Sequence, residues 1–226
     1  LVTLLCTPTH LKFLALGFLT SEGLISSRGD IKKILVDDQR GVVRVETKTQ
    51  TDDSTDLVFK RFITSGCGRG AAFYSPVDAS DHEKVESKTD ISFEQVISLM
   101  KEFQHASEIY KNTHGVHSAA LSDGNKFLIF RDDIGRHNAI DKIFGECLWS
   151  GIPVDERLIV TSGRMSSEIL FKVAKRGVPI LISKSAPTNL AVSTAEDLGV
   201  TLIGFVRGNR FDVFANSWRV NGTQSS

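Results

Sequence analysis

A single cysteine, Cys67, lies between glycines in the stretch TSGCGRG at residues 64–70. An apolar run precedes it, as a strand leads into a tight loop, and the glycines strip that loop of bulk. A thiol becomes a useful nucleophile when it ionises and solvent can reach it, and Arg69 and the amides of a bare loop both favour the thiolate. No histidine or aspartate neighbours Cys67 in the sequence, so a hydrolase dyad would need partners from elsewhere. The pattern favours covalent carriage of a group on sulfur, and a cysteine without a chemical role is the alternative.

The three cysteines are widely spaced, and neither a Cys-x-x-Cys pair nor a Cys/His zinc spacing occurs. This argues against a disulfide framework and a structural zinc site, and it favours a reducing cytoplasm. We expect Cys6 and Cys147, which have apolar neighbours, to be buried packing thiols. The sequence opens at Leu1 without a methionine, so we expect the true N-terminus, with any targeting segment, to be missing.

Length and charge narrow the class of protein. The chain has 226 residues and a formal net charge of +0, so no global field draws it to nucleic acid or to an anionic membrane. No apolar run reaches the roughly 20 residues that a membrane-spanning helix needs. An anionic ligand would therefore have to be held by a local cluster of arginines.

Three candidate ligand loops follow strands, and in open α/β sheets ligands bind beyond the carboxyl ends of the strands. Ser162-Gly163-Arg164 precedes a helix whose first amides could hold a phosphate. Ser185–Thr188 begins another helix, and RDDIGRHNAID at 131–141 follows KFLIF. A fourth stretch, FVRGNR at 205–210, places Arg207 and Arg210 around a glycine turn, which suits bidentate phosphate contacts.

Each of these stretches also has an ordinary explanation. Ser-Gly and Ala-Pro-Thr sequences are common strand–helix loops, although their concurrence at one sheet edge favours a site. His137, beside Arg136, could be a catalytic base or simply bond the backbone at a helix start. His117 lies in an apolar strand and is expected to be a core or site-wall residue rather than a metal ligand.

From residue 157 onward, β-branched stretches alternate with amphipathic ones, which predicts a parallel sheet with helical crossovers. Asp123-Gly124-Asn125 is the strongest hairpin signal. FDVFANS is expected to return as an antiparallel edge strand. The other predicted elements are a buried strand at 1–6, a helix from Thr7-Pro8 to Gly23, strands at 31–36 and 42–47, a helix over 91–113 and a helix over 138–149.

Six stretches form long, distinctive blocks: LVTLLCTPTHLKFLALGFLTSEGLI, TSGCG, GVHSAAL, RDDIGRHNAIDKIFG, TSGRMSSEILFKVAKRGVPILISKSAPTNLAV and TLIGFVRGNRFDVF. Together they resemble the formate dehydrogenase accessory sulfurtransferase (FdhD/NarQ) family. The resemblance covers nearly the whole chain and lapses only in the polar segments near 47–56 and 76–90.

The resemblance implies a fold and a division into domains. The fold class is α/β, a three-layer α/β/α sandwich resembling cytidine deaminase, with a small N-terminal α+β domain. The small domain is expected over residues 1–60, and the deaminase-like domain, which carries the Cys67 loop, over 61–226. Zinc deaminases need H-x-E and P-C-x-x-C, and neither pattern occurs, so deamination and a zinc ion are not expected.

The resemblance also implies a function. Members are cytoplasmic homodimeric sulfurtransferases that take sulfur from a cysteine desulfurase as a cysteine persulfide. They pass it to the molybdenum bis-guanine-dinucleotide cofactor, for which GDP or GMP is a mimic, and so mature the catalytic subunit of formate dehydrogenase. The persulfide cysteine corresponds to Cys67. The cofactor-binding stretch corresponds to Phe205, Val206, Arg207, Gly208, Asn209 and Arg210, to which we add the loops with Ser162, Gly163, Arg164, Ser185 and Thr188.

The sequence departs from the family pattern at two positions. Many relatives carry Cys-Gly-x-Cys-Gly, whereas here Gly70 replaces the second cysteine, which argues against a dithiol mechanism. Relatives tend to have a second glycine where this chain has His114. The loss of the second thiol keeps an alternative open, a non-enzymatic chaperone that delivers the cofactor and moves no sulfur.

Overall fold

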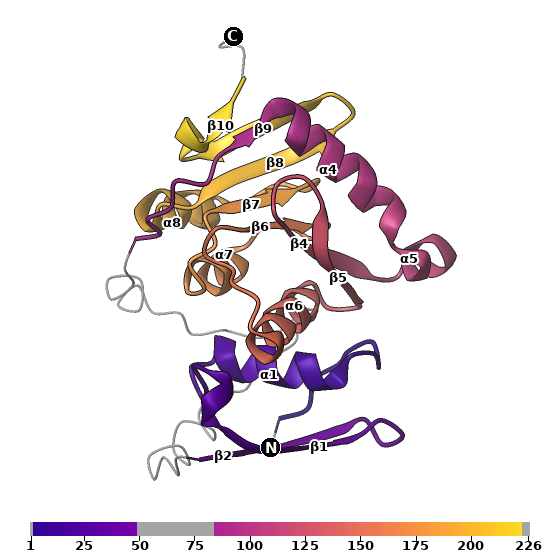
Figure 1. Ribbon diagram of the computed structural model, residues 1–226. Helices are drawn as coiled ribbons and strands as arrows, with labels where there is room; N and C mark the ends of the chain where they lie inside the picture. The colour runs from indigo at the N-terminus through magenta and orange to yellow at the C-terminus, as the bar shows by residue number, and fades with distance from the viewer. Residues whose placement is uncertain (1, 49–83, 223–226) are drawn as a thin grey trace. The chain divides into compact units, whose positions relative to one another are not determined.

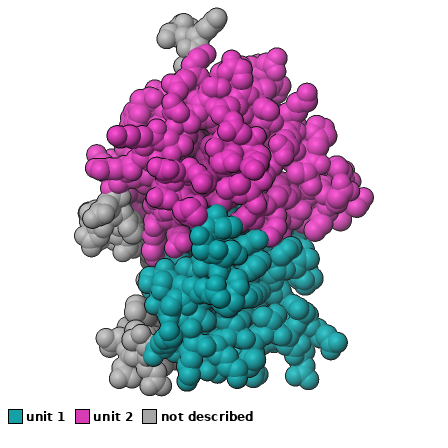
Figure 2. Space-filling view, viewed as in Figure 1, with its two compact units in different colours: residues 1–73, 133–152 teal, residues 74–132, 153–226 magenta. Residues whose placement is uncertain are grey.

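The computed structural model describes residues 2–48 and 84–222. These residues form two compact units, one of residues 2–48 and 133–152 and the other of residues 84–132 and 153–222 (Figure 2). The expected domain boundary at residue 60 lies outside the described residues. The sequence-based division placed residues 133–152 in the larger domain, whereas the structure packs them with the N-terminal segment.

Two helices cross closely in the first unit. Helix α1 (Leu11–Ser21) packs along helix α6 (Arg136–Ser150), with glycine at the closest points. A Cβ atom added at Gly17 would overlap the carbonyl group of Asp141, and one at Gly145 would overlap the carbonyl group of Phe13. Glycine therefore lets the two backbones touch, and this close approach joins residues distant in sequence into one unit.

A β-hairpin completes the first unit. Strands β1 (Ile31–Asp37) and β2 (Val42–Thr47) pair antiparallel, as the sequence predicts, and a 3-10 turn, η1 (Arg28–Asp30), precedes them. Gly41 adopts a positive φ of 64° where the chain enters β2. Ile34 pairs with Val45 and Val36 with Val43, so one hairpin face is apolar.

The prediction of a buried strand at 1–6 is wrong. Residues 2–7 are described without regular structure, and helix α1 begins at Leu11 rather than at Thr7-Pro8. The reason is that α6 and the turn before it take up the polar groups of this segment. The Thr7 amide donates to Asp133 (3.1 Å), the Thr7 hydroxyl accepts from the Ile134 amide (3.1 Å), and Asn138 donates to the Leu5 carbonyl (2.9 Å).

A six-stranded mixed sheet, ordered β5-β4-β6-β7-β8-β9, forms the centre of the second unit (Figure 1). The middle strands β6, β7 and β8 are parallel, as predicted, and β4 and β9 run antiparallel to their neighbours β6 and β8. The strands are β4 (His117–Ser122), β5 (Phe127–Asp133), β6 (Leu158–Thr161), β7 (Ile180–Ser183), β8 (Thr201–Arg207) and β9 (Arg210–Ala215).

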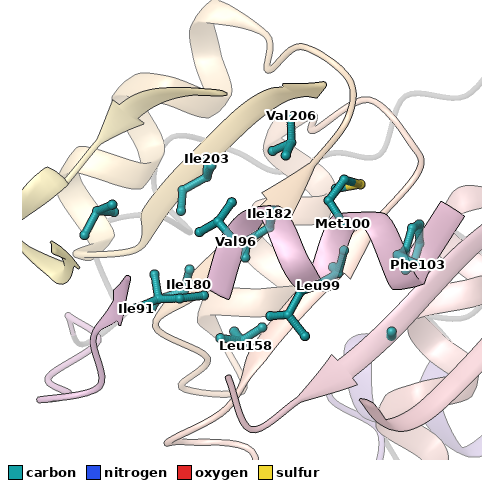
Figure 3. Packing of buried hydrophobic residues seen from close by; sticks show 13 residues of the cluster. Ile91, Val96, Leu99, Met100, Phe103, Leu158, Ile180, Ile182, Ile203 and Val206 are labelled. Atoms are coloured by element: carbon teal, nitrogen blue, oxygen red, sulfur yellow. The ribbon is translucent and has the colours of Figure 1, made fainter. Parts of the chain in front are cut away.

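Helices cover both faces of this sheet, which gives three layers. Helix α4 (Phe93–Ala106) lies on one face, and α7 (Ser167–Ala174) and α8 (Asn189–Leu198) lie on the other (Figure 1). The α4 side chains meet alternate residues of the strands in a closed apolar cluster (Figure 3). A short parallel pair, β3 (Ile91–Ser92) with β10 (Val220–Asn221), adds Ile91 and Val220 to it. The mixed α/β class is as expected, and the likeness to cytidine deaminase stays a prediction.

The single helix predicted over 91–113 is two helices. Ser92 begins α4 with a capping box to Gln95, and the helix ends at Ala106. Ser107 is extended, with φ −88° and ψ 110°, and its hydroxyl accepts from the Tyr110 amide and so begins α5 (Glu108–Thr113). The same hydroxyl donates to Asp132 at 2.8 Å, and this tertiary bond holds Ser107 out of a continuous helix.

Candidate functional site

Two consecutive strands of the parallel sheet end in loops of the same design. The Thr161 hydroxyl at the end of β6 accepts from the Gly163 amide (3.2 Å), and the Ser183 hydroxyl at the end of β7 accepts from the Ser185 amide (3.0 Å). In each case the hydrogen bond from the amide two residues later stabilises a turn, by which the chain leaves the sheet and runs toward a helix. The predicted loops with Ser162–Arg164 and Ser185–Thr188 therefore leave the sheet at the same edge.

Direct hydrogen bonds join the two loops. The Ser185 hydroxyl donates to the Ser162 carbonyl (3.0 Å), and the Ser183 hydroxyl donates to the Gly163 carbonyl (2.8 Å). Met165 exchanges backbone bonds with the second loop, donating to the Ala186 carbonyl and accepting from the Thr188 amide. The sequence-predicted loops Ser162–Arg164 and Ser185–Thr188 are thus brought together, and we call this pair of loops the ledge.

The two helix starts on this ledge differ. The Thr188 side chain caps α8 by accepting from the Ala191 amide (3.2 Å). Ser166 stands at the equivalent position of α7, but its side chain makes no capping bond. Its hydroxyl oxygen is buried and has no partner among the residues that the structure describes. An anion at this helix start could receive that hydroxyl and the first helical amides, so the residues suit a phosphate group.

Strand β8 meets the ledge at Gly204 and Phe205. A Cβ atom at Gly204 would lie 2.8 Å from the Phe214 ring and 3.1 Å from the Ser185 carbonyl oxygen, so glycine allows the strand to approach the loop closely. The Phe205 amide donates to the same carbonyl (3.3 Å), and the residue adopts a positive φ of 52° within a register shift of the β8–β9 pair. The residue is 39% exposed, and its ring contacts that of Phe214, with the ring centroids 5.9 Å apart.

The rest of the predicted stretch 205–210 divides between core and surface. Val206 is fully buried and packs in the α4 cluster, so its side chain is remote from solvent (Figure 3). Arg207 and Arg210 are exposed and pair across the turn, which Gly208 makes with a φ of 57°. Asn209, also in this turn, is exposed. The turn presents two guanidinium groups at one end of the hairpin, which suits contacts with phosphate.

A polar cluster lies beside the ledge, and it contains His117, which the sequence predicted to be a core or site-wall residue, and Lys184, which it did not single out. His117 begins β4, and its Nδ1 atom lies 3.3 Å from the Ser162 hydroxyl, which also accepts from the Ser118 amide (2.9 Å). Lys184 places its ammonium group 5.3 Å from the centre of the Tyr110 ring. The antiparallel register of β4 with β6 brings His117 to Ser162, and no local sequence pattern predicts that register.

Several predicted site residues cannot be joined to this cluster. Cys67, with Arg69 and Gly70, lies outside the described residues. Arg136 and His137 begin α6 in the other unit. Cys147 is buried, as expected, whereas Cys6 is only half-buried. Burial, reinforced by the Asp133 charge, raises the pKa of the Cys6 thiol, and Lys142 opposes the rise.

Residues 2–48 and 84–222 contain neither a candidate metal-binding cluster nor a candidate membrane-spanning helix. No group of three or more histidine, cysteine, aspartate or glutamate side chains there could hold a metal ion. No helix there is long and apolar enough to cross a lipid bilayer.

The fold and the ledge define a mixed α/β protein whose two strand–helix loops are joined at one edge of the sheet, and comparison with known proteins gives its family. The FdhD/NarQ family profile matches residues 1–221, so the chain belongs to that family. It is 48% identical over 220 residues to the sulfur carrier protein FdhD of Bacillus subtilis (strain 168), covering 97% of this chain and 84% of that protein. It is 44% identical over 218 residues to the sulfur carrier protein FdhD of Staphylococcus aureus (strain MRSA252), covering 96% and 82%.

A solved structure has the same fold. It is the crystal structure of a candidate formate dehydrogenase accessory protein from Desulfotalea psychrophila, with a TM-score of 0.75 and 27% sequence identity. The match covers 95% of this chain and 81% of that one.

Proposed function

We propose that this protein is a sulfur carrier that acts in the maturation of formate dehydrogenase. The observation that carries the proposal is the similarity, over nearly the whole chain, to proteins named sulfur carrier protein FdhD. The proposed setting is the cytoplasm, and the proposed client is the catalytic subunit of formate dehydrogenase. We further propose that the chain acts as a homodimer.

The proposed loading step uses one thiol. The Cys67 thiolate attacks the outer sulfur of a persulfide on a cysteine desulfurase, and the desulfurase cysteine leaves as a thiolate. One S–S bond forms as another breaks, so the step needs no oxidant or reductant. Gly70 stands where a second thiol would be expected, so the sulfur is carried on Cys67 alone.

The proposed acceptor is the molybdenum bis-guanine-dinucleotide cofactor, bound as a substrate. The ledge supports this role, because a buried Ser166 hydroxyl without a described partner and an uncapped α7 can receive a phosphate. Arg207 and Arg210 can hold a second phosphate, and the exposed Phe205 ring can stack on a guanine base. GDP is the simplest probe of this subsite.

The loading step is tested by sulfur transfer. The purified chain is incubated with a cysteine desulfurase and cysteine, and bound sulfur is located by mass spectrometry of its peptides. We expect one added sulfur atom on the peptide with Cys67 in the wild type and in Cys6→Ala, and none in Cys67→Ala. Sulfur retained by Cys67→Ala would refute the assignment of Cys67.

Gly70 favours a second candidate function, a chaperone that holds the cofactor without moving sulfur. Complementation of a strain that cannot mature formate dehydrogenase separates the two. If Cys67→Ala restores enzyme activity and the Arg207→Ala, Arg210→Ala double variant does not, the chaperone function is correct. If Cys67→Ala fails while the folded protein accumulates, the sulfur carrier function is correct.

A further inference from the structure

Asp132, near the end of β5, bridges two parts of the second unit. Its Oδ1 atom accepts from the Ser118 hydroxyl at 2.6 Å, and its Oδ2 atom accepts from the Ser107 hydroxyl at 2.8 Å. Ser118 belongs to β4, and Ser107 begins helix α5. One carboxylate therefore links the sheet to α5. A chain of contacts, which we call an arm, continues from each of its two oxygen atoms.

The first arm runs from Ser118 to the ledge. The Ser118 amide donates to the Ser162 hydroxyl (2.9 Å), and the Ser118 carbonyl accepts from the Ser162 amide (3.0 Å). Ser162 in turn contacts the His117 ring and accepts the Ser185 hydroxyl on its carbonyl. A shift of Ser118 would therefore move the imidazole and both loops of the ledge.

The second arm runs through α5 and reaches the same loop. The Ser107 hydroxyl accepts from the Tyr110 amide (2.9 Å), and the Tyr110 ring lies under the Lys184 ammonium group. No side chain of α5 is buried, so its place depends strongly on these contacts. Lys184 and Ser185 are neighbours in the chain, so the two arms meet there and form a closed circuit of contacts that begins and ends at Asp132.

We propose that Asp132 is a positioning residue of the nucleotide subsite, holding His117 and Lys184 at the ledge for an anionic ligand. The inference rests on the proposed function, because it takes the phosphate of a guanine nucleotide as that ligand. A carboxylate suits this place, since it accepts two hydroxyl hydrogen bonds at once and bonds to charged groups are strong.

Two substitutions separate positioning from charge. Asp132→Ala removes the hydrogen bonds to both Ser118 and Ser107. Asp132→Asn keeps the shape of the side chain but not its charge, and the amide can still accept from Ser118 and can donate to the Ser107 hydroxyl. The matched control is Asp123→Ala. Asp123 lies in the β4–β5 turn and accepts from the amides of Asn125 and Lys126, which are not part of the circuit of contacts through Asp132. The control weakens the same hairpin and leaves Ser107 and Ser118 untouched.

The first measurement is the affinity for GDP by calorimetry. We expect Asp132→Ala to weaken binding about tenfold or more, and Asp132→Asn and Asp123→Ala to stay within about threefold of the wild type. Combining Asp132→Ala with Ser118→Ala should add no further loss, because the arm is already broken. Affinity unchanged in a folded Asp132→Ala protein would overturn the proposal.

The second measurement does not depend on nucleotide. Amide hydrogen exchange should rise in α5, at the Tyr110 amide above all, in Asp132→Ala and not in Asp123→Ala. Exchange unchanged in Asp132→Ala would overturn the positioning role whatever GDP does. If the exchange rises but the wild type binds no GDP, the nucleotide subsite of the proposed function is wrong, and the assignment of Asp132 to that subsite is overturned with it.

Discussion

The ammonium group of Lys142 lies 2.7 Å from a carboxylate oxygen of Asp133, and neither side chain is exposed to solvent. Asp133 also accepts from the Gly135 amide and from Asn138, at 2.8 and 2.9 Å. Lys142 also donates to the Thr7 carbonyl (3.1 Å). The buried pair is thus surrounded by hydrogen bonds, and it ties the N-terminal segment to α6.

Replacing Lys142 by methionine should destabilise the first unit severely. The variant leaves the Asp133 carboxylate buried without its counter-charge, a change that typically costs about 3–5 kcal/mol. Urea unfolding at neutral pH, followed by tryptophan fluorescence, measures the free energy of unfolding, since Trp149 lies on α6.

The control for this prediction removes the second charge as well. The Lys142→Met, Asp133→Asn double variant should be more stable than the sum of the two single losses implies, because no unpaired charge remains. A loss below about 1 kcal/mol in Lys142→Met would contradict the buried pair.

Alanine at Gly17 or Gly145 should force α1 and α6 apart. Each added methyl group would meet a backbone carbonyl, that of Asp141 or of Phe13, and backbone cannot rotate away as a side chain can. Overpacking of this kind costs about 1–3 kcal/mol or more. Thermal unfolding should show both variants melting well below the wild type.

Gly115→Ala is the matched substitution for this pair. Its Cβ atom would meet its nearest neighbours, in Thr113, at 3.7 Å, an ordinary contact. We expect its melting temperature to equal that of the wild type. Equal stability of Gly17→Ala and Gly115→Ala would show that the helices do not cross at these glycines.

Much of the second unit could be predicted because its signals are local. The β-branched runs gave β6, β7 and β8, and Asp123-Gly124-Asn125 marked the turn between β4 and β5. The ledge followed from these elements, because parallel neighbours end at one edge of the sheet. Ser162 and Ser185, which belong to the ledge, could therefore be predicted from the sequence.

The remaining features depend on contacts between distant residues. Ser107 interrupts a helical pattern because Asp132, 25 positions later, accepts its hydroxyl. Thr7 fails as a helix cap because Asp133 and Ile134 take its amide and its hydroxyl. Such partners follow from strand register and helix crossing, which periodicity does not encode.

Asp30 should titrate at unusually low pH. The amides of Ser26 and Ser27 and the hydroxyl of Ser26 donate to its carboxylate and hold its pKa at about 2, below the usual 3.8. Because the folded pKa is the lower one, the stabilisation is complete above the unfolded value near 4 and is lost as the pH falls toward about 2. The ¹³C shift of the carboxyl carbon, followed by NMR, measures this titration.

Asp30→Asn tests the consequence for stability. Between about pH 4 and pH 2, its free energy of unfolding should fall less steeply than that of the wild type. Asp38→Asn, in the exposed turn of the β1–β2 hairpin, should leave that slope unchanged. A titration midpoint of Asp30 near 4 would contradict the hydrogen bonds seen at η1.

Arg207→Ala and Arg210→Ala should each weaken GDP binding, and lysine should not fully replace either arginine. Arg207 and Arg210 lie on either side of one exposed turn. A planar guanidinium group can donate two parallel hydrogen bonds to two oxygens of one phosphate, whereas an ammonium group lacks this geometry. We expect about a tenfold loss of affinity for each alanine variant and a weaker dependence on salt, since fewer charges meet the phosphates. Stability should change by less than about 0.5 kcal/mol, because the residues are exposed. Arg44→Ala, an exposed arginine of β2 in the other unit, is the control, and an equal loss of affinity there would place the nucleotide elsewhere.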